Sequence, residues 1–148
     1  MKPHHLGHVH LKVSNLEKSK EFYTRFFGLK VTEELGGHFV FLSLGDHHHD
    51  VALMDVGKEA KHPSKNETGL FHFAFEVKTK KDFAEFFKKF KDEGLFPETV
   101  DYGISQAIYI QDPDENVVEV YVDTRDKVHE WKGKTKLLQE EEIISHLK

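Results

Sequence analysis

Cysteine is absent from this chain of 148 residues. Without thiols there is no disulfide, no thiolate metal site and no cysteine nucleophile, so any metal must be held by nitrogen and oxygen ligands. The sequence also lacks an apolar run near the roughly 20 residues that cross a bilayer, and its start, MKPHHLGHVH, lacks the apolar core of a signal peptide. These absences predict a cytoplasmic protein with no membrane partner.

A large excess of charge of one sign is missing as well. The chain has 21 Lys and Arg against 26 Asp and Glu, a formal net charge of -5, and both signs are interspersed. Because no broad basic face results, nucleic acid is not expected as a partner. With 38% hydrophobic and 32% charged residues, the composition is that of an ordinary globular protein, long enough to bury a core.

Two segments of the chain follow the same plan. Residues 7–13 alternate like a strand, and a capping-box pattern at Ser14 to Glu17 opens an aromatic-rich helix that stops at Gly28. Residues 71–77 and the helix between Thr79 and Gly94 repeat this plan at an offset of 72 - 8 = 64. Further strands are predicted at about 29–35, 38–44, 49–55, 96–101, 106–111 and 116–123. The sequence therefore predicts an α+β fold of two βαβββ modules, each packed against its twin.

The expected organisation is one domain over residues 1–148. The first module covers about 5–56, a polar linker about 57–68, the second module about 69–123 and a tail 124–148. Apolar residues near the end of the tail favour a short packing helix, and the alternative is a contact with a second subunit in a homodimer.

The placement of the 12 histidines points to a metal site. His8 and His72 occupy the same place in the two copies of the first strand, on the face opposite to the apolar residues. Glu119 lies on the inward face of the last predicted strand, where an unpaired carboxylate would be costly. A lone strand histidine is more often structural, but the agreement with the repeat favours a ligand set of two imidazoles and one carboxylate. Such a facial triad suits Fe(II) and leaves positions open for substrate and O2.

The sequence resembles the vicinal oxygen chelate superfamily over roughly residues 5–131. The similar segments are GHVHLKVSNLEKSKEFYTRFFGLKV, FHFAFEV and YIQDPDENVVEVYVD. The resemblance implies paired βαβββ modules whose curved sheets form an open barrel around a metal site, with His8, His72 and Glu119 as ligands. The superfamily includes glyoxalase I, fosfomycin and bleomycin resistance proteins, and extradiol ring-cleaving dioxygenases.

Within the superfamily, the sequence is most similar to small extradiol catechol dioxygenases. Glyoxalase I has a fourth protein ligand, a glutamate in the segment that is DVALMDV here, where neither His nor Glu occurs. The strict repeat offset, 119 - 64 = 55, reaches Asp55, whose shorter side chain leaves a fourth ligand open as an alternative, but three ligands fit a dioxygenase better than a glyoxalase. The resemblance gives His49 a place in the substrate pocket and Tyr109 a hydrogen bond to a substrate oxygen. Tyr102 is the nearest equivalent of a histidine in the extradiol signature, and Glu115 stands where the signature has Gly or Pro.

This resemblance implies an Fe(II)-dependent extradiol-type dioxygenase that acts with O2 on a small aromatic vicinal diol. One alternative is a redox-neutral isomerase, lyase or transferase of the glyoxalase type, with Mn, Ni, Zn or Co as the metal. Another is a resistance protein of the bleomycin kind that sequesters a ligand without chemistry. The intact set His8, His72 and Glu119 argues against the last, since sequestration needs no metal.

Overall fold

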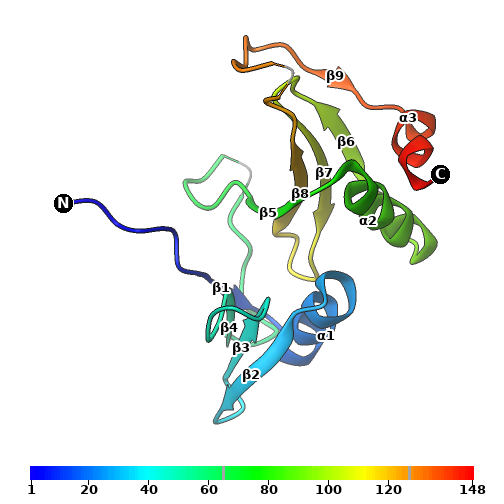
Figure 1. Ribbon diagram of the computed structural model, residues 1–148. Coiled ribbons are helices and arrows are strands. Elements are labelled where there is room, and N and C mark those ends of the chain that lie inside the picture. Colours follow the sequence, from blue (N-terminus) through cyan, green and yellow to red (C-terminus); the bar gives the residue numbers. More distant parts are fainter. Residues whose placement is uncertain (65, 127) are drawn as a thin grey trace. The chain divides into compact units, whose positions relative to one another are not determined.

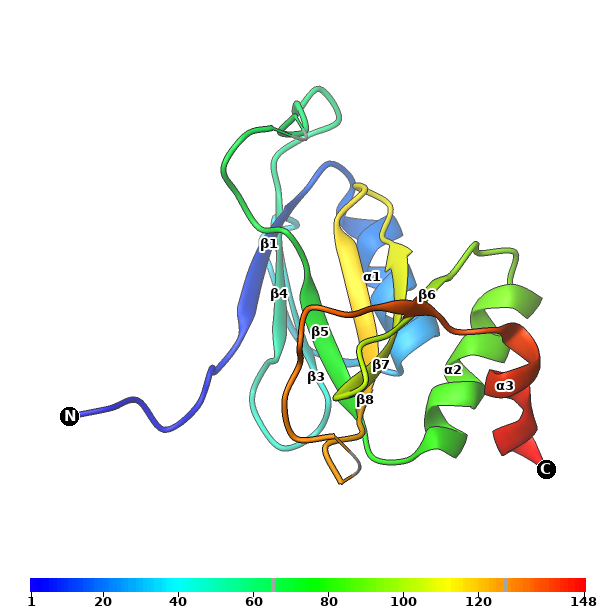
Figure 2. The ribbon, with the colours of Figure 1, turned by 90° about the horizontal axis from the view of Figure 1, so that it is seen from above.

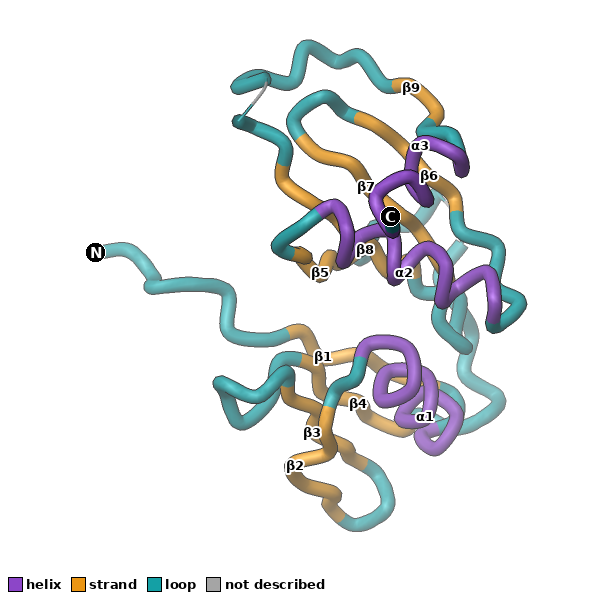
Figure 3. Tube along the Cα trace, turned by 45° about the vertical axis from the view of Figure 1, so that its right-hand side comes forward, coloured by secondary structure: helices purple, strands orange, loops and turns teal. Residues whose placement is uncertain are grey.

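The computed structural model describes residues 1–64, 66–126 and 128–148 (Figure 1). Residue 65 of the predicted linker and residue 127 of the predicted tail lie outside the described residues. The chain divides into two compact units, one of residues 1–69 with 112–115 and the other of residues 70–111 with 116–148. In each unit a long helix lies beside the strands of one sheet (Figure 3). No helix in the described ranges is long and apolar enough to cross a membrane.

The first unit is a four-stranded sheet with one helix. In chain order its elements are β1 (Val9–Val13), α1 (Leu16–Phe27), β2 (Lys30–Leu35), β3 (Phe39–Ser43) and β4 (Val51–Asp55). The strand order is β1-β4-β3-β2, with β1 parallel to β4 and the other pairs antiparallel. The apolar faces of β1, β3 and β4 are buried with the aromatic stripe of α1, as the alternation predicts.

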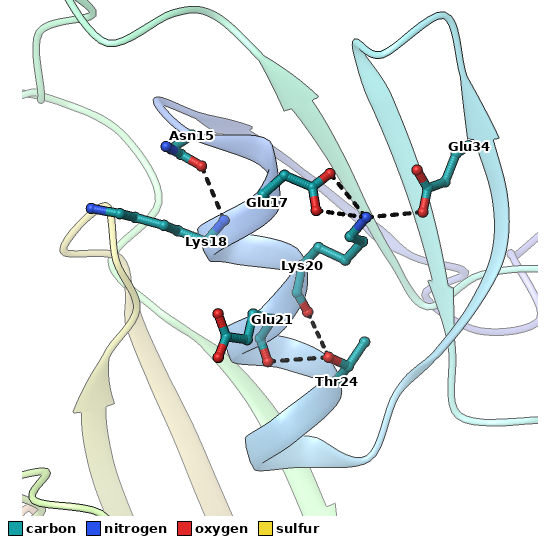
Figure 4. A network of polar contacts seen from close by, with 7 residues as sticks. All are labelled: Asn15, Glu17, Lys18, Lys20, Glu21, Thr24 and Glu34. Carbon is teal, nitrogen blue, oxygen red and sulfur yellow. Dashed lines mark hydrogen bonds and ion pairs between the residues drawn. The ribbon is translucent and has the colours of Figure 1, made fainter.

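The α1 helix begins one residue later than the capping pattern predicts. The N-cap is Asn15, whose side chain accepts a hydrogen bond from the Lys18 backbone N–H, so the prediction of a capping box at Ser14 is wrong. The Ser14 N–H instead donates a hydrogen bond to the Asp114 carboxylate. On the exposed side of the helix, Lys20 makes an ion pair with Glu17 of the same helix and a second one with Glu34, which joins α1 to β2 (Figure 4). The helix ends at Gly28, where φ is 68°.

The second unit repeats this plan with additions from the tail. It contains β5 (Phe73–Val77), α2 (Lys80–Asp92), β6 (Glu98–Asp101), β7 (Ser105–Gln111), β8 (Val117–Asp123), β9 (Lys136–Leu137), α3 (Glu140–Ile144) and a 3-10 turn, Ser145–Leu147. The strand order is β5-β8-β7-β6-β9. The predicted start of α2 is confirmed, because Thr79 and Asp82 form a complete capping box. Each module is therefore βαβββ, and the predicted α+β class is confirmed.

The tail packs on the second unit. The α3 helix lies alongside α2 in both views (Figures 1 and 2), and Ile143 is buried there. The predicted packing helix is thus confirmed. The preceding strand β9, which pairs with β6, was not predicted, because a two-residue strand carries no periodicity that a sequence pattern can register.

The offset of 64 residues between equivalent positions of the two modules holds for their first strands but not for their last strands. It relates β1 to β5 residue for residue, but β1 pairs Val9 with Val51 whereas β5 pairs Phe73 with Val118, so the last strands differ by 118 - 51 = 67. Glu119 pairs with Ala74. His10, which is the first-module equivalent of Ala74, pairs with Ala52. The counterpart of Glu119 in the first module is therefore Ala52, and the mapping onto Asp55 is wrong because the second module is three residues longer before its last strand.

The turn between β7 and β8 belongs to the first unit. Its Asp112 accepts a hydrogen bond from the Tyr23 hydroxyl at 2.7 Å, and its Asp114 accepts hydrogen bonds from the Ser14 N–H and the Ser19 hydroxyl. In the same turn Glu115 has φ of 62°, in the left-handed region that favours glycine. Contacts of buried carboxylates with α1 thus define the place of the turn that precedes β8.

Candidate metal and substrate site

The second unit brings His72 and Glu119 together. His72 lies directly before β5, and Glu119 lies on β8, the parallel neighbour of β5. The partner of Glu119 across the strands is Ala74, two residues after His72, so the two side chains share one face of the sheet. The His72 Nε2 atom is 2.9 Å from the Glu119 Oε2 atom. The side chain of Glu119 is 11% exposed and that of His72 is 30% exposed, which leaves the pair accessible from one side.

Two tyrosines extend this pair into a polar cluster. Tyr109 is the antiparallel partner of Glu119, so its side chain lies on the same face of the sheet, beside Glu119. The Tyr102 hydroxyl is 2.9 Å from the Tyr109 hydroxyl. Burial, the bond to Tyr102 and the charge of Glu119 all raise the pKa of Tyr109. Tyr109 consequently remains protonated at neutral pH and acts as a hydrogen-bond donor.

The electrostatics of the cluster fit a divalent cation. Burial raises the pKa of Glu119, while His72 and the Tyr109 hydroxyl favour its ionised form. The second ring nitrogen of His72, Nδ1, is buried and has no hydrogen-bond partner among the described residues. A desolvated carboxylate needs positive charge, and the ring nitrogen of His72 that faces Glu119 is Nε2. Histidine nitrogen and carboxylate oxygen are also the donor types that a chain without cysteine can offer a metal.

The first unit contributes a group of histidines at the start of β1. The ring centroids of His8 and His49 are 4.4 Å apart, and the His49 ring also lies against Phe41. The Nδ1 atoms of His48 and His49 are 2.9 Å apart, so one ring donates to the other. Partial burial and then the neighbouring His8 and His48 lower the pKa of His49. A neutral His49 can therefore accept a proton near His8 at neutral pH.

The six site residues predicted from the sequence thus fall into two groups. His72, Glu119, Tyr109 and Tyr102 form one cluster in the second unit, and His8 lies beside His49 in the first unit. Within either unit, the described side chains include no group of three or more His, Asp or Glu placed to hold a metal ion. The union of His8 with His72 and Glu119 stays a prediction. His10, the other histidine on the same face as His8, is exposed and lies against Phe39.

The sequence did not predict a cavity of about 380 Å³ next to Tyr109 in the second unit. Its lining includes Phe96, Glu98, Tyr109, Gln111 and Val117. Glu98 pairs with Tyr109 across β6 and β7, so both face the same side of the sheet. The alternation of β6 and β7 in the sequence indicates which side chains share a face, but the pairing register is needed to place Glu98 opposite Tyr109. The volume is in the range of small-molecule sites.

Among known proteins with similar sequences are several that are named dioxygenases. The biphenyl-2,3-diol 1,2-dioxygenase 2 of Rhodococcus globerulus is 28% identical over 118 residues, which cover 79% of this chain and 62% of the relative. The catechol-2,3-dioxygenase of Bacillus subtilis (strain 168) is 28% identical over 127 residues, which cover 80% of this chain and 41% of the relative. The chain thus spans less than two thirds of the length of these relatives.

Solved structures share the fold. A lactoylglutathione lyase from Agrobacterium tumefaciens is 25% identical with a TM-score of 0.66, covering 82% of this chain and 96% of that one. A genomically encoded fosfomycin resistance protein from Listeria monocytogenes is 20% identical with a TM-score of 0.63, covering 84% and 98%. The family model described as glyoxalase/bleomycin resistance protein/dioxygenase superfamily matches residues 5–120. With most of its length matched and its fold shared, the chain belongs to this superfamily.

Proposed function

We propose that the protein is an Fe(II)-dependent extradiol-type dioxygenase that cleaves the ring of a small aromatic vicinal diol. The observation that carries the proposal is Ala52 at the first-module counterpart of Glu119. An alanine side chain cannot ligate a metal, so the proposed set would have three protein ligands and not the four that the resemblance associates with glyoxalase I. The names of the relatives, biphenyl-2,3-diol and catechol dioxygenases, support the same reaction class.

The proposed ligands are His8, His72 and Glu119. The Nε2 atom of His72 and the Oε2 atom of Glu119 are already in contact at 2.9 Å, which supports a shared ion at these two atoms. His8 would complete the set if the two units act as one domain, with modules paired within a chain or exchanged in a homodimer. Bound Fe(II) would supply reactivity toward O2 and open positions for the two oxygens of the diol. Mn, Ni, Zn or Co would fit the same donors.

The residues around the ligands would orient the substrate and handle its protons. Tyr109 keeps its proton because burial raises its pKa, so its hydroxyl would donate a hydrogen bond to an ionised diol oxygen. The Tyr102 hydroxyl, 2.9 Å from the Tyr109 hydroxyl, would orient it by a hydrogen bond. His49, with its lowered pKa, would accept the proton that the diol loses on binding. The cavity beside Tyr109 would receive the aromatic ring.

The test begins with anaerobic loading of the purified protein with Fe(II), followed by metal analysis and an O2-uptake screen with catechols. The proposal predicts close to one iron per chain and O2 uptake with the yellow absorbance of a ring-cleaved product. Glu119→Gln should lose both iron and activity. Glu76→Gln is the matched control, because Glu76 is an exposed carboxylate that accepts a hydrogen bond from Tyr121 on the same sheet.

A redox-neutral metalloenzyme is the second candidate, favoured by the fold shared with a lactoylglutathione lyase at 25% identity. It would convert its substrate without O2 and would accept Mn, Ni, Zn or Co. An absence of O2 uptake with every catechol by an iron-loaded protein would refute the dioxygenase proposal. Retention of a ligand without any turnover would instead indicate a sequestering protein.

A further inference from the structure

The tail and the β6–β7 turn of the second unit form a second pocket, of about 500 Å³. Tyr102 lies in its wall, and the rings of Tyr102 and Trp131 are nearly perpendicular, with centroids 5.9 Å apart. The Trp131 indole N–H donates to the Lys134 carbonyl oxygen, and β9 attaches the end of this segment to β6. An aromatic contact, a hydrogen bond and a strand pair therefore hold the tail in place around the pocket.

The pocket is locally positive although the chain is negative overall. Lys132, Lys134 and Lys136 line it, whereas Asp101 and Glu130 are its acidic residues. Lys136 is paired with Asp101 at 3.4 Å. Among the described residues, neither Lys132 nor Lys134 has an ion-pair partner, and together they outnumber Glu130. A surplus cation beside an apolar wall favours a ligand that has both an apolar body and an anionic group.

One side chain separates this pocket from the candidate site. The Tyr102 ring forms part of the pocket wall, while its hydroxyl is 2.9 Å from that of Tyr109, which in turn contacts Glu119. We propose that the pocket binds a carboxylate-bearing substituent of the substrate, with Lys132 and Lys134 as the residues that determine this specificity. That the anionic ligand is the substrate rests on the proposed function; the preference for an aromatic carboxylate rests on the pocket itself.

A binding experiment tests the pocket without catalysis. Trp131 is the only tryptophan of the chain, so its fluorescence reports on ligands beside Tyr102. The purified protein should bind 3-phenylpropionate about tenfold more tightly than the uncharged 3-phenylpropionamide, and added salt should reduce the difference. Lys132→Gln/Lys134→Gln should abolish the preference. The control Lys58→Gln/Lys61→Gln, which removes two exposed lysines outside the pocket, should retain it.

A turnover experiment connects the pocket with the reaction. Wild-type kcat/KM for O2 uptake should be higher with 3-(2,3-dihydroxyphenyl)propionate than with catechol, and the pocket variant should reduce this ratio about tenfold. Equal binding of the acid and the amide by the wild type, or an unchanged preference in the pocket variant, would overturn the inference even if the enzyme is active. A carboxylate preference that is lost in the pocket variant, without oxidation of any diol, would confirm the anion pocket and refute the dioxygenase function.

Discussion

Tyr23 offers a quantitative test of the contact that fixes the turn before β8. The side chain is fully buried, and its hydroxyl donates to Asp112 Oδ2 at 2.7 Å, while Asp112 is only 5% exposed. Tyr23→Phe keeps the packed ring but removes a donor from a buried carboxylate. Hydrogen bonds to charged groups contribute roughly 1.5 to 3 kcal/mol net, so the free energy of unfolding should fall by about 2 kcal/mol.

The assay is urea unfolding followed by circular dichroism and Trp131 fluorescence, with wild type and variant compared at the same pH. Tyr121→Phe is the matched control, since the Tyr121 hydroxyl donates to Glu76 at an exposed position and its loss should cost less than about 0.5 kcal/mol. If Tyr23→Phe were no more destabilising than Tyr121→Phe, burial would not strengthen the Asp112 contact. The explanation for the position of the turn would then fail.

Two further predictions concern the second unit. If Tyr102 occupies the place of the extradiol histidine, Tyr102→His should raise the rate of catechol cleavage by roughly tenfold or more, because a histidine exchanges a proton at neutral pH. Steady-state O2 uptake measures this rate, and fast turnover by the wild type would show that Tyr102 does not occupy that place. Although burial opposes its ionisation, hydrogen bonds from Gly103 and Gln106 and the charge of Lys136 lower the pKa of Asp101. A lowered carboxyl pKa stabilises the fold above the unfolded pKa of about 3.9. Asp101→Asn should therefore be less stable than wild type at pH 7, and the difference should shrink as the pH falls from about 4 through the lowered pKa; a difference independent of pH in denaturant titrations would contradict this.

Local patterns in the sequence predicted the first strand and helix of each module. Three predictions depend on near neighbours in the chain: the alternation of residues 7–13 and 71–77, the capping box at Thr79 and the stop at Gly28. Ser14 misled the prediction of the α1 cap, because its N–H is used by Asp114, 100 residues away. A local sequence pattern cannot predict a contact between residues that lie so far apart in the chain.

The residues of the candidate site could be predicted from the sequence, but the register in which the strands pair could not. His72 next to Glu119, and Tyr109 opposite Glu119, agree with the alternation of β5, β7 and β8. The equivalence of Glu119 with Ala52 required the strand pairing, because the lengths of the connecting segments differ between the modules. The lysine pocket also required tertiary structure, because it forms only where the tail meets the β6–β7 turn.

The most direct test of the account is anaerobic Fe(II) binding by four single variants. The proposed ligand set predicts that His8→Ala, His72→Ala and Glu119→Ala each lose most of the iron that the wild type binds, while far-UV circular dichroism stays unchanged. Asp55→Ala should bind iron like the wild type, because Ala52 and not Asp55 is the counterpart of Glu119. Full iron occupancy in any of the first three variants, or its loss in Asp55→Ala, would contradict a metal centre on His8, His72 and Glu119.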